Sequence, residues 1–401
     1  MQDANSPNSR PGVPRYQAWN GIALFRNGFR PFFLASGLSA FVFMVAWIAM
    51  LEGALSLDRV YDSIQWHAHE MIFGTLTAAV AGFLLTAIPN WTGRLPLQGW
   101  PLIGLTVLWL AGRIAMVAGT AASPLIVALV DNAFLFALLA VVVREIVAGR
   151  NWRNLPVVTA LGLLAAANII SHLEALGEIG TYGFGARMGI SVIAALIALI
   201  GGRIIPSFTG NWLAKQDGVH RRPSAFGKFD VVTIIVTIIS LGAWTGFPEQ
   251  SVTGGALFVA GVANMVRIAR WQGYHTVREP LVWSLHLGYL WLPVGLILLG
   301  LSHVSEDVPA NAGIHALTAG AMGGMILAVM TRATLGHTGR ALMADKATLF
   351  IYGFAFLAAL TRVAASLAPE LYAPLLILAG GSWCAAFGLF SIRYGTILLS
   401  R

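Results

Sequence analysis

Twelve long apolar stretches dominate this chain, and each is close to or above the roughly 20 residues that an α-helix needs to cross a bilayer. Only 10% of the 401 residues are charged, whereas soluble domains carry roughly 25%. The mean hydropathy is +0.75. We therefore expect an all-α polytopic membrane protein with about twelve transmembrane helices. The stretches lie at about 32–53, 67–90, 99–121, 123–148, 155–174, 186–206, 229–247, 252–270, 279–301, 311–332, 345–368 and 371–395.

The placement of lysine and arginine predicts the orientation of these helices. Most basic side chains fall on one side of the membrane, together with both ends of the chain, so both termini are expected to be cytoplasmic. This placement accounts for the net charge of +8, and nucleic-acid binding is not expected. The chain divides into a cytoplasmic N-terminal tail, 1–31, and a single membrane domain, 32–401. Its halves, about 32–206 and 229–395, are joined by a cytoplasmic loop at 207–228.

Two histidines stand at the mouth of the second stretch, in the sequence Trp66-His67-Ala68-His69-Glu70-Met71. Imidazole and carboxylate groups at the edge of a membrane helix are costly without partners, and histidine is the commonest protein metal ligand. Residues two apart on a helix point about 200° away from each other, so His67 and His69 are expected to serve two different sites. Glu70 follows His67 by three residues and would orient that imidazole. It is also a candidate proton relay.

Four more histidines are candidate ligands because of their depth in the apolar stretches. His172 and His315 lie toward the same outer end as the pair, whereas His286 lies about 10 Å from the cytoplasmic end at 1.5 Å per residue. His337 is expected in a cytoplasmic loop, 22 residues after His315. That separation is about 33 Å along a helix, which excludes a shared metal.

The single cysteine, Cys384, limits the kinds of cofactor attachment. It excludes thiolate clusters and covalent haem attachment, so any haem must be held by side-chain ligation. Arg113 and Arg203 lie inside apolar stretches, where each would either pair with a haem propionate or extend its charge to the interface. Structural or solvated roles are expected for the other histidines, which are His220, His275 and His303.

Several short motifs occur in order along nearly the whole chain. They are Arg30-Pro31-Phe32-Phe33, the histidine motif above, Ala87-Ile88-Pro89-Asn90-Trp91-Thr92-Gly93, the run from Gly202 to Thr209, Leu285-His286-Leu287-Gly288-Tyr289 and the run from His315 to Arg340. Together these motifs resemble the NnrS family. The resemblance implies about twelve helices in the bacterial cytoplasmic (inner) membrane, haem and copper as cofactors, and a role linked to denitrification and nitrosative stress.

The resemblance also implies that the protein handles nitric oxide, and we expect it to reduce or detoxify the gas at a histidine-ligated haem. Such an oxidoreductase, similar to a nitric oxide reductase, would hold a non-covalent b-type haem, with copper as a further candidate. Electrons would come from a membrane quinol or a cytochrome, and nitric oxide and membrane lipid are the expected partners. The candidate haem-binding residues are His67, His69, His286, His315 and Arg203. The candidate metal ligands are His67, His69, His172, His286, His315 and His337.

Other functions stay open at this point. A transporter or exporter of metal or nitrosyl species suits twelve helices in two halves equally well, and it need not retain haem. A non-catalytic nitric-oxide-binding protein, acting as a sensor or an assembly factor, is the third alternative. The lack of a cytoplasmic output domain argues against sensing.

Overall fold

The computed structural model describes residues 19–56, 61–117, 123–216 and 222–400. His220 and most of the expected N-terminal tail lie outside these ranges. The described residues form helices joined by turns and contain no strand, so the all-α prediction is confirmed.

Within the described ranges, twelve helical spans are long and apolar enough to cross a membrane, which confirms the multi-pass architecture. Seven spans consist of one helix each: α1 (Phe29–Leu51), α4 (Trp100–Val117), α5 (Pro124–Ala148), α9 (Lys228–Gly246), α10 (Ser251–Ala269), α11 (Pro280–Leu301) and α14 (Lys346–Leu367). The fifth and twelfth spans begin with a 3₁₀ turn: η4 (Trp152–Asn154) before α6 (Leu155–Ala175), and η8 (Pro369–Leu371) before α15 (Tyr372–Leu399).

The other three spans change from α to π geometry and back. The second span is α2 (Ser63–His69), η2 (Glu70–Leu76) and α3 (Thr77–Thr92); the sixth is α7 (Phe184–Leu196), η5 (Ile197–Gly201) and α8 (Gly202–Leu213); the tenth is α12 (Ala310–His315), η7 (Ala316–Gly323) and α13 (Gly324–His337). Among the described residues, two short 3₁₀ helices lie outside the spans, η1 (Ala23–Arg26) and η6 (Gly273–Thr276).

Several spans are longer than the sequence predicts, and in the sixth and the tenth the extension changes a prediction. The sixth continues through α8 to Leu213, so the connection expected at 207–228 begins only after that residue. Thr209 and Leu213 are buried, and this packing holds the segment in a helix although Gly210 disfavours one. The tenth span likewise continues to His337, which is therefore the last residue of a helix and not a loop residue.

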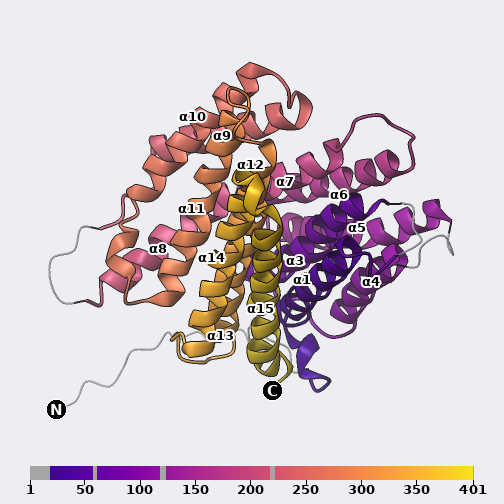
Figure 1. Cartoon of the computed structure of the whole chain (residues 1–401). Coiled ribbons are helices and arrows are strands. Elements are labelled where there is room, and N and C mark those ends of the chain that lie inside the picture. The colour runs from indigo at the N-terminus through magenta and orange to yellow at the C-terminus, as the bar shows by residue number, and fades with distance from the viewer. Residues whose placement is uncertain (1–18, 57–60, 118–122, 217–221, 401) are drawn as a thin grey trace, which may run out of the picture.

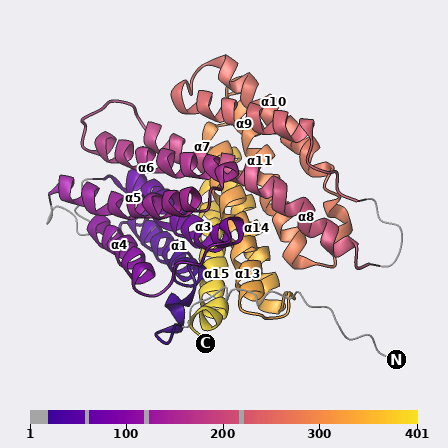
Figure 2. The same ribbon diagram turned by 180° about the vertical axis from the view of Figure 1, so that it is seen from behind.

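The second span is the most enclosed of the twelve in the described ranges, with 72% of its most apolar window buried, and it packs against α1, α4, α5, α6, α7 and α13. In Figure 1, α1, α14 and α15 stand side by side, with α4 and α5 to one side and α9 and α10 to the other. Figure 2 shows the reverse face, where α3 and α15 lie near the middle. Large apolar side chains of the outer helices point away from the bundle, as a lipid-facing surface requires. Examples are Leu125 and Leu129 on α5 and Ile235 and Ile239 on α9.

The π-helical segments lie next to residues that the sequence singles out. η2 begins directly after His69, η7 begins directly after His315, and η5 ends two residues before Arg203. Such segments are rare and occur mostly at functional sites. The π-helical segments therefore indicate candidate functional sites in the second, sixth and tenth spans.

Candidate metal centre

Three buried side chains from three helices form a group that could hold a metal ion. His69 ends α2, Asp131 lies in α5 and His172 lies near the end of α6; one ligand atom from each lies within 4.8 Å of the others. His69 Nε2 and His172 Nε2 lie 3.3 Å and 3.0 Å from the same oxygen, Asp131 Oδ2. Two imidazole nitrogens thus converge on one carboxylate oxygen. Imidazole donors suit zinc, copper, iron and nickel.

Two more side chains hold this group in place. Asn168 lies one turn before His172; its Nδ2 donates to Asp131 Oδ2 at 2.8 Å, and its Oδ1 faces His69 Nε2 at 2.8 Å. The Tyr61 hydroxyl is hydrogen-bonded to His172 Nδ1, so that Nε2 is the nitrogen facing Asp131. Contacts of this kind orient the imidazoles of metal sites and tune their basicity.

A buried arginine joins the group to a second carboxylate. Arg113 in α4 donates to Glu70 Oε1 at 2.6 Å and also to Asp131 Oδ1. Glu70 is 0% exposed, and its Oε1 lies 3.2 Å from His69 Nδ1. If the histidines are neutral, two carboxylates and one guanidinium leave one negative charge uncompensated, which is costly in a buried site. Glu70 Oε2 is also buried without a hydrogen-bond partner among the described residues. The site therefore suits one further cation, either a metal ion or a proton.

Two glycines leave room for these charges. A Cβ atom on Gly74 of η2 would lie 2.6 Å from Arg113 Nη1, and a Cβ atom on Gly112 of α4 would lie 2.9 Å from Asp131 Oδ1. The Trp109 indole donates to the carbonyl of Gly74 at 3.0 Å, which ties α4 to η2. Close helix contact and the charged group thus depend on the same small residues.

Replacing Gly74 by alanine is expected to destabilise the protein by about 1–3 kcal/mol, because the added methyl group overlaps a guanidinium that two carboxylates hold in place. Thermal unfolding of the detergent-purified variant measures this. Gly104→Ala in α4 is the matched control, since a Cβ there meets nothing within 4 Å and alanine is the better helix former. An unchanged unfolding temperature for Gly74→Ala would contradict the packing argument.

His67 has different neighbours from His69. Its ring stacks on Trp47 of α1, with 4.6 Å between the ring centroids and 17° between the planes. Its Nδ1 is buried and has no hydrogen-bond partner in the described part of the chain. The two imidazoles face different surroundings, as the two-residue spacing leads us to expect. Metal binding by His67 stays a prediction.

His315 is not part of the metal group, and it lies within electrostatic range of His67. The two histidines interact electrostatically, and Arg362 of α14 interacts with both. His315 Nδ1 donates to the carbonyl oxygen of Asn311 at 2.9 Å, which places the lone pair of the ring on Nε2. We therefore group the candidate histidines at the outer end as two pairs: His69 with His172, which share Asp131, and His67 with His315, which share the electrostatic influence of Arg362.

Two expected partnerships differ from those in the structure. Glu70 contacts His69 instead of His67. The backbone from His67 to Glu70 is still α-helical, so the difference comes from the side-chain partners: Arg113 donates to Glu70 Oε1 at 2.6 Å, whereas the His67 ring stacks on Trp47. Arg113 is paired with the protein's own carboxylates, and it neither extends to the interface nor stands free for a propionate.

The remaining candidates lie away from the metal centre. His286 in α11 is hydrogen-bonded through Nε2 to the hydroxyl of Thr209 in α8 at 2.8 Å. That hydroxyl donates to the carbonyl of Ile205, so it is His286 that donates to Thr209. His337 and Arg203 line one cavity, which is separate from both histidine pairs.

Asp131, Asn168 and Tyr61 are not among the residues predicted from the sequence. A signal for the first was present, because Asp131 and Asn132 interrupt an otherwise apolar span, and an ionisable residue there usually has a function. Tyr61 carries no such signal, since tyrosine is common at membrane interfaces.

Comparison with known proteins agrees with the family resemblance that the sequence motifs indicate. A protein-family model described as "NnrS protein" matches residues 23–401. No curated protein matches the chain. The matched range includes all twelve spans and every residue of the metal centre. By this match the chain belongs to the NnrS family, as its motifs predict.

Proposed function

We propose that this NnrS-family protein binds a metal ion and a haem in the bacterial inner membrane and reduces or otherwise detoxifies nitric oxide. The observation that carries the proposal is the buried group of His69, Asp131 and His172, whose donor atoms lie within 4.8 Å of one another. Ionisable side chains inside membrane helices are expensive and are rarely retained without a function. A bound cation accounts for their convergence and for the uncompensated negative charge.

His69, Asp131 and His172 would hold the metal, and we assign copper because imidazole donors suit it and the family resemblance implies it. When bound, copper would supply a centre that exchanges one electron and binds a small neutral ligand. Asn168 contacts both His69 Nε2 and Asp131, and Tyr61 contacts His172 Nδ1, so these two side chains hold the imidazoles beside Asp131. These contacts leave the rings little freedom to reorient, which favours a fixed coordination geometry.

His67 and His315 are the residues that we propose for the haem. Nδ1 of His67 is buried and unpaired within the described ranges, and the lone pair of His315 lies on Nε2. Arg362, which acts on both histidines, is a suitable partner for anionic propionates. When bound, the haem would supply an iron atom that binds nitric oxide.

Reduction of two nitric oxide molecules to nitrous oxide and water consumes two electrons and two protons. For proton delivery we propose Glu70, because its Oε2 is buried and unpaired beside the centre while Arg113 holds Oε1 at 2.6 Å. Electrons would come from a membrane quinol or a cytochrome. Nitric oxide is uncharged and dissolves in lipid, so it would approach through the apolar surfaces of the helices.

The first test is the haem and metal content of detergent-purified protein, measured by pyridine haemochrome and elemental analysis, followed by addition of nitric oxide to the reduced sample. Haem near one per chain, with a spectral change that decays as nitrous oxide appears, is the expected result. Stable haem that binds nitric oxide without turnover would instead favour a non-catalytic binding protein. Well-folded protein without haem or metal would overturn the proposal and favour transport.

Single-histidine variants test whether the two pairs serve different cofactors. We expect His69→Ala to lower metal content while haem content stays near wild type, and His315→Ala to lower haem content while the metal is retained. His275→Ala, in η6, is the control and should change neither. Loss of both cofactors in each of the first two variants would contradict the assignment of two separate centres.

A further inference from the structure

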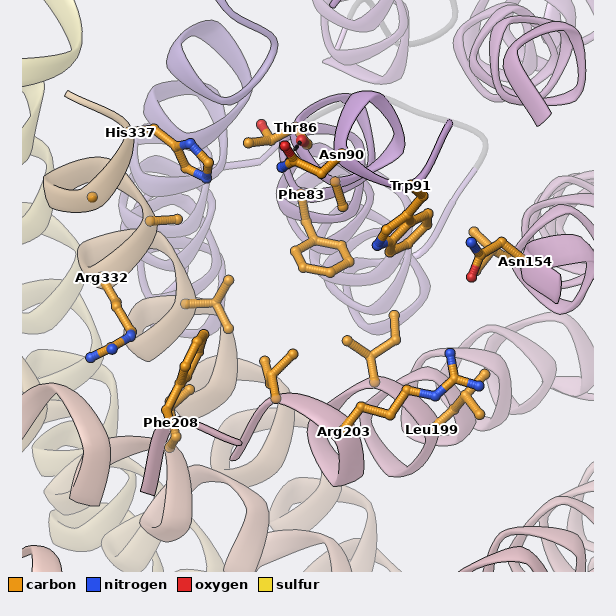
Figure 3. Close-up of a pocket in the computed structure, with 18 of the residues that line it drawn as sticks. Phe83, Thr86, Asn90, Trp91, Asn154, Leu199, Arg203, Phe208, Arg332 and His337 are labelled. Atoms are coloured by element: carbon orange, nitrogen blue, oxygen red, sulfur yellow. Dashed lines mark hydrogen bonds between the residues drawn. The ribbon is translucent and has the colours of Figure 1, made fainter. Parts of the chain in front are cut away.

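A cavity of about 560 Å³ lies at the end of the bundle where α3, α6 and α13 terminate or begin. Its walls come from α3, from the start of α6, from the join of η5 with α8, and from α13. Figure 3 shows Arg332 and His337 on one wall and Arg203 and Asn154 on another, with the ring of Phe83 between them. The volume is in the range of small-molecule and cofactor sites, roughly 300–1,000 Å³.

The charged residues that line this cavity are all basic. They are Arg153, Arg203 and Arg332, with His337 beside them, and no aspartate or glutamate is among the lining residues. None of the three arginines forms an ion pair with a carboxylate in the described part of the chain. The guanidinium carbon of Arg332 lies 4.2 Å from the centre of the Phe208 ring. Glu279 acts electrostatically on Arg332, but it is not one of the residues that line the cavity. The cavity therefore has positive charge that no anion of the protein neutralises within it.

The rest of the lining is mostly apolar. The interior is lined by partly buried apolar side chains, those of Phe83, Trp91, Leu199, Ile204 and Val329. By contrast, three of the basic residues are exposed: Arg153, Arg203 and His337. An apolar interior with a cationic rim matches a molecule that has an apolar body and an anionic group. Basic pockets between membrane helices bind the head groups of anionic lipids for the same reason.

The position of the cavity fits such a ligand. Asn90 is two residues from the end of α3, Arg153 is in the turn before α6, and His337 ends α13. The ends of membrane spans lie at the level of lipid head groups. Asn90 also follows His69 by 21 residues in one span, which is about 30 Å along a helix. The cavity is thus a separate place from the metal centre.

We propose that this cavity binds an amphipathic organic anion, with its phosphate or carboxylate group held by Arg203 and Arg332 and its apolar body against Phe83 and Trp91. The head group of an anionic phospholipid and a free amphipathic carboxylate present the same chemistry, and the test separates these two sources. Binding here is independent of the proposed handling of nitric oxide.

The experiment is native mass spectrometry of the full chain, delipidated in detergent and titrated with phosphatidylglycerol, phosphatidylcholine or dodecanoate. The cavity variant is Arg203→Gln/Arg332→Gln. The control variant is Lys215→Gln/Arg278→Gln, which loses the same charge at exposed positions outside the cavity. A second cavity variant, Ala333→Phe, keeps every arginine and fills space. Unfolding temperature and metal content show whether each variant is folded.

We expect wild type and the control variant to retain one phosphatidylglycerol in preference to phosphatidylcholine. Both cavity variants should bind it about tenfold or more weakly, because two charge contacts or the space for the apolar body are lost. Binding of dodecanoate alone, with the same dependence on the cavity, would support the site and identify a free carboxylate as its ligand. Equal binding of every probe to the cavity and control variants would overturn the proposal.

Discussion

Asp131→Asn is expected to remove the bound metal from a protein that still folds. Asp131 Oδ2 lies 3.0 Å from His172 Nε2 and 3.3 Å from His69 Nε2, so it is the oxygen shared by both imidazoles. Conversion of the Asp131 carboxylate to an amide removes the negative charge. The amide still offers an oxygen and a nitrogen for hydrogen bonds, but it no longer offers an anionic metal ligand. Loss of an outer contact in a metal site already lowers affinity about 10–100-fold, and loss of a ligand should cost at least as much. Elemental analysis after dialysis against a chelator measures this.

The fold should tolerate this change because the local charges become balanced. Without the Asp131 carboxylate, Arg113 still donates to Glu70 Oε1 at 2.6 Å, and one cation faces one anion. The matched control is Asp230→Asn. Asp230 is also buried and accepts from a buried arginine, Arg267, at 2.9 Å, but it lies in α9 and not in the metal group. Metal retained by Asp131→Asn, or lost equally in both variants, would contradict the proposed centre.

The twelve spans could be predicted from the sequence because each is fixed by a local property, the length of an apolar run. Every predicted stretch overlaps one observed span. The ends of the spans are harder to predict because tertiary packing decides them. For example, α8 continues to Leu213, and within it Thr209 is hydrogen-bonded to His286 of α11, a contact that no local pattern indicates. The orientation of the bundle and its division into halves stay predictions.

The metal centre was only half predictable. The spacing of His67 and His69 indicated different neighbours, but not which helices supply them. Asp131 is 62 residues after His69, and only the packing of α2, α5 and α6 brings the two together. The π-helical segment that begins at Glu70 is equally hidden, because no local sequence pattern indicates it; in the fold this segment packs closely against Arg113 at Gly74. Partners that are distant in the chain and local changes of helix geometry both require the folded structure.

Arg113→Gln is expected to destabilise the protein by about 3–5 kcal/mol, the usual cost of removing one partner from a buried charge pair. Arg113 donates to both Glu70 and Asp131, so the variant leaves two carboxylates uncompensated at 0% and 2% exposure. Unfolding in detergent, followed by circular dichroism or by fluorescence-detected size exclusion, measures the loss. Wild-type stability in Arg113→Gln would show that the two carboxylates are neutral in the folded protein.

Arg267→Gln provides the control that distinguishes a metal-linked charge from an ordinary buried one. It also removes the nearest cation from a buried carboxylate, that of Asp230, which keeps only Arg270 at 3.9 Å, so this variant should be destabilised as well. In the proposed centre, however, added copper ions would bind His69, Asp131 and His172 only in the folded protein, and binding to the folded state alone raises stability by mass action. Copper should therefore restore stability to Arg113→Gln, where the metal replaces the lost positive charge, and should leave the deficit of Arg267→Gln unchanged relative to wild type. Equal rescue of both variants would mean that the ion acts elsewhere, and the buried charge at Arg113 would then be structural alone.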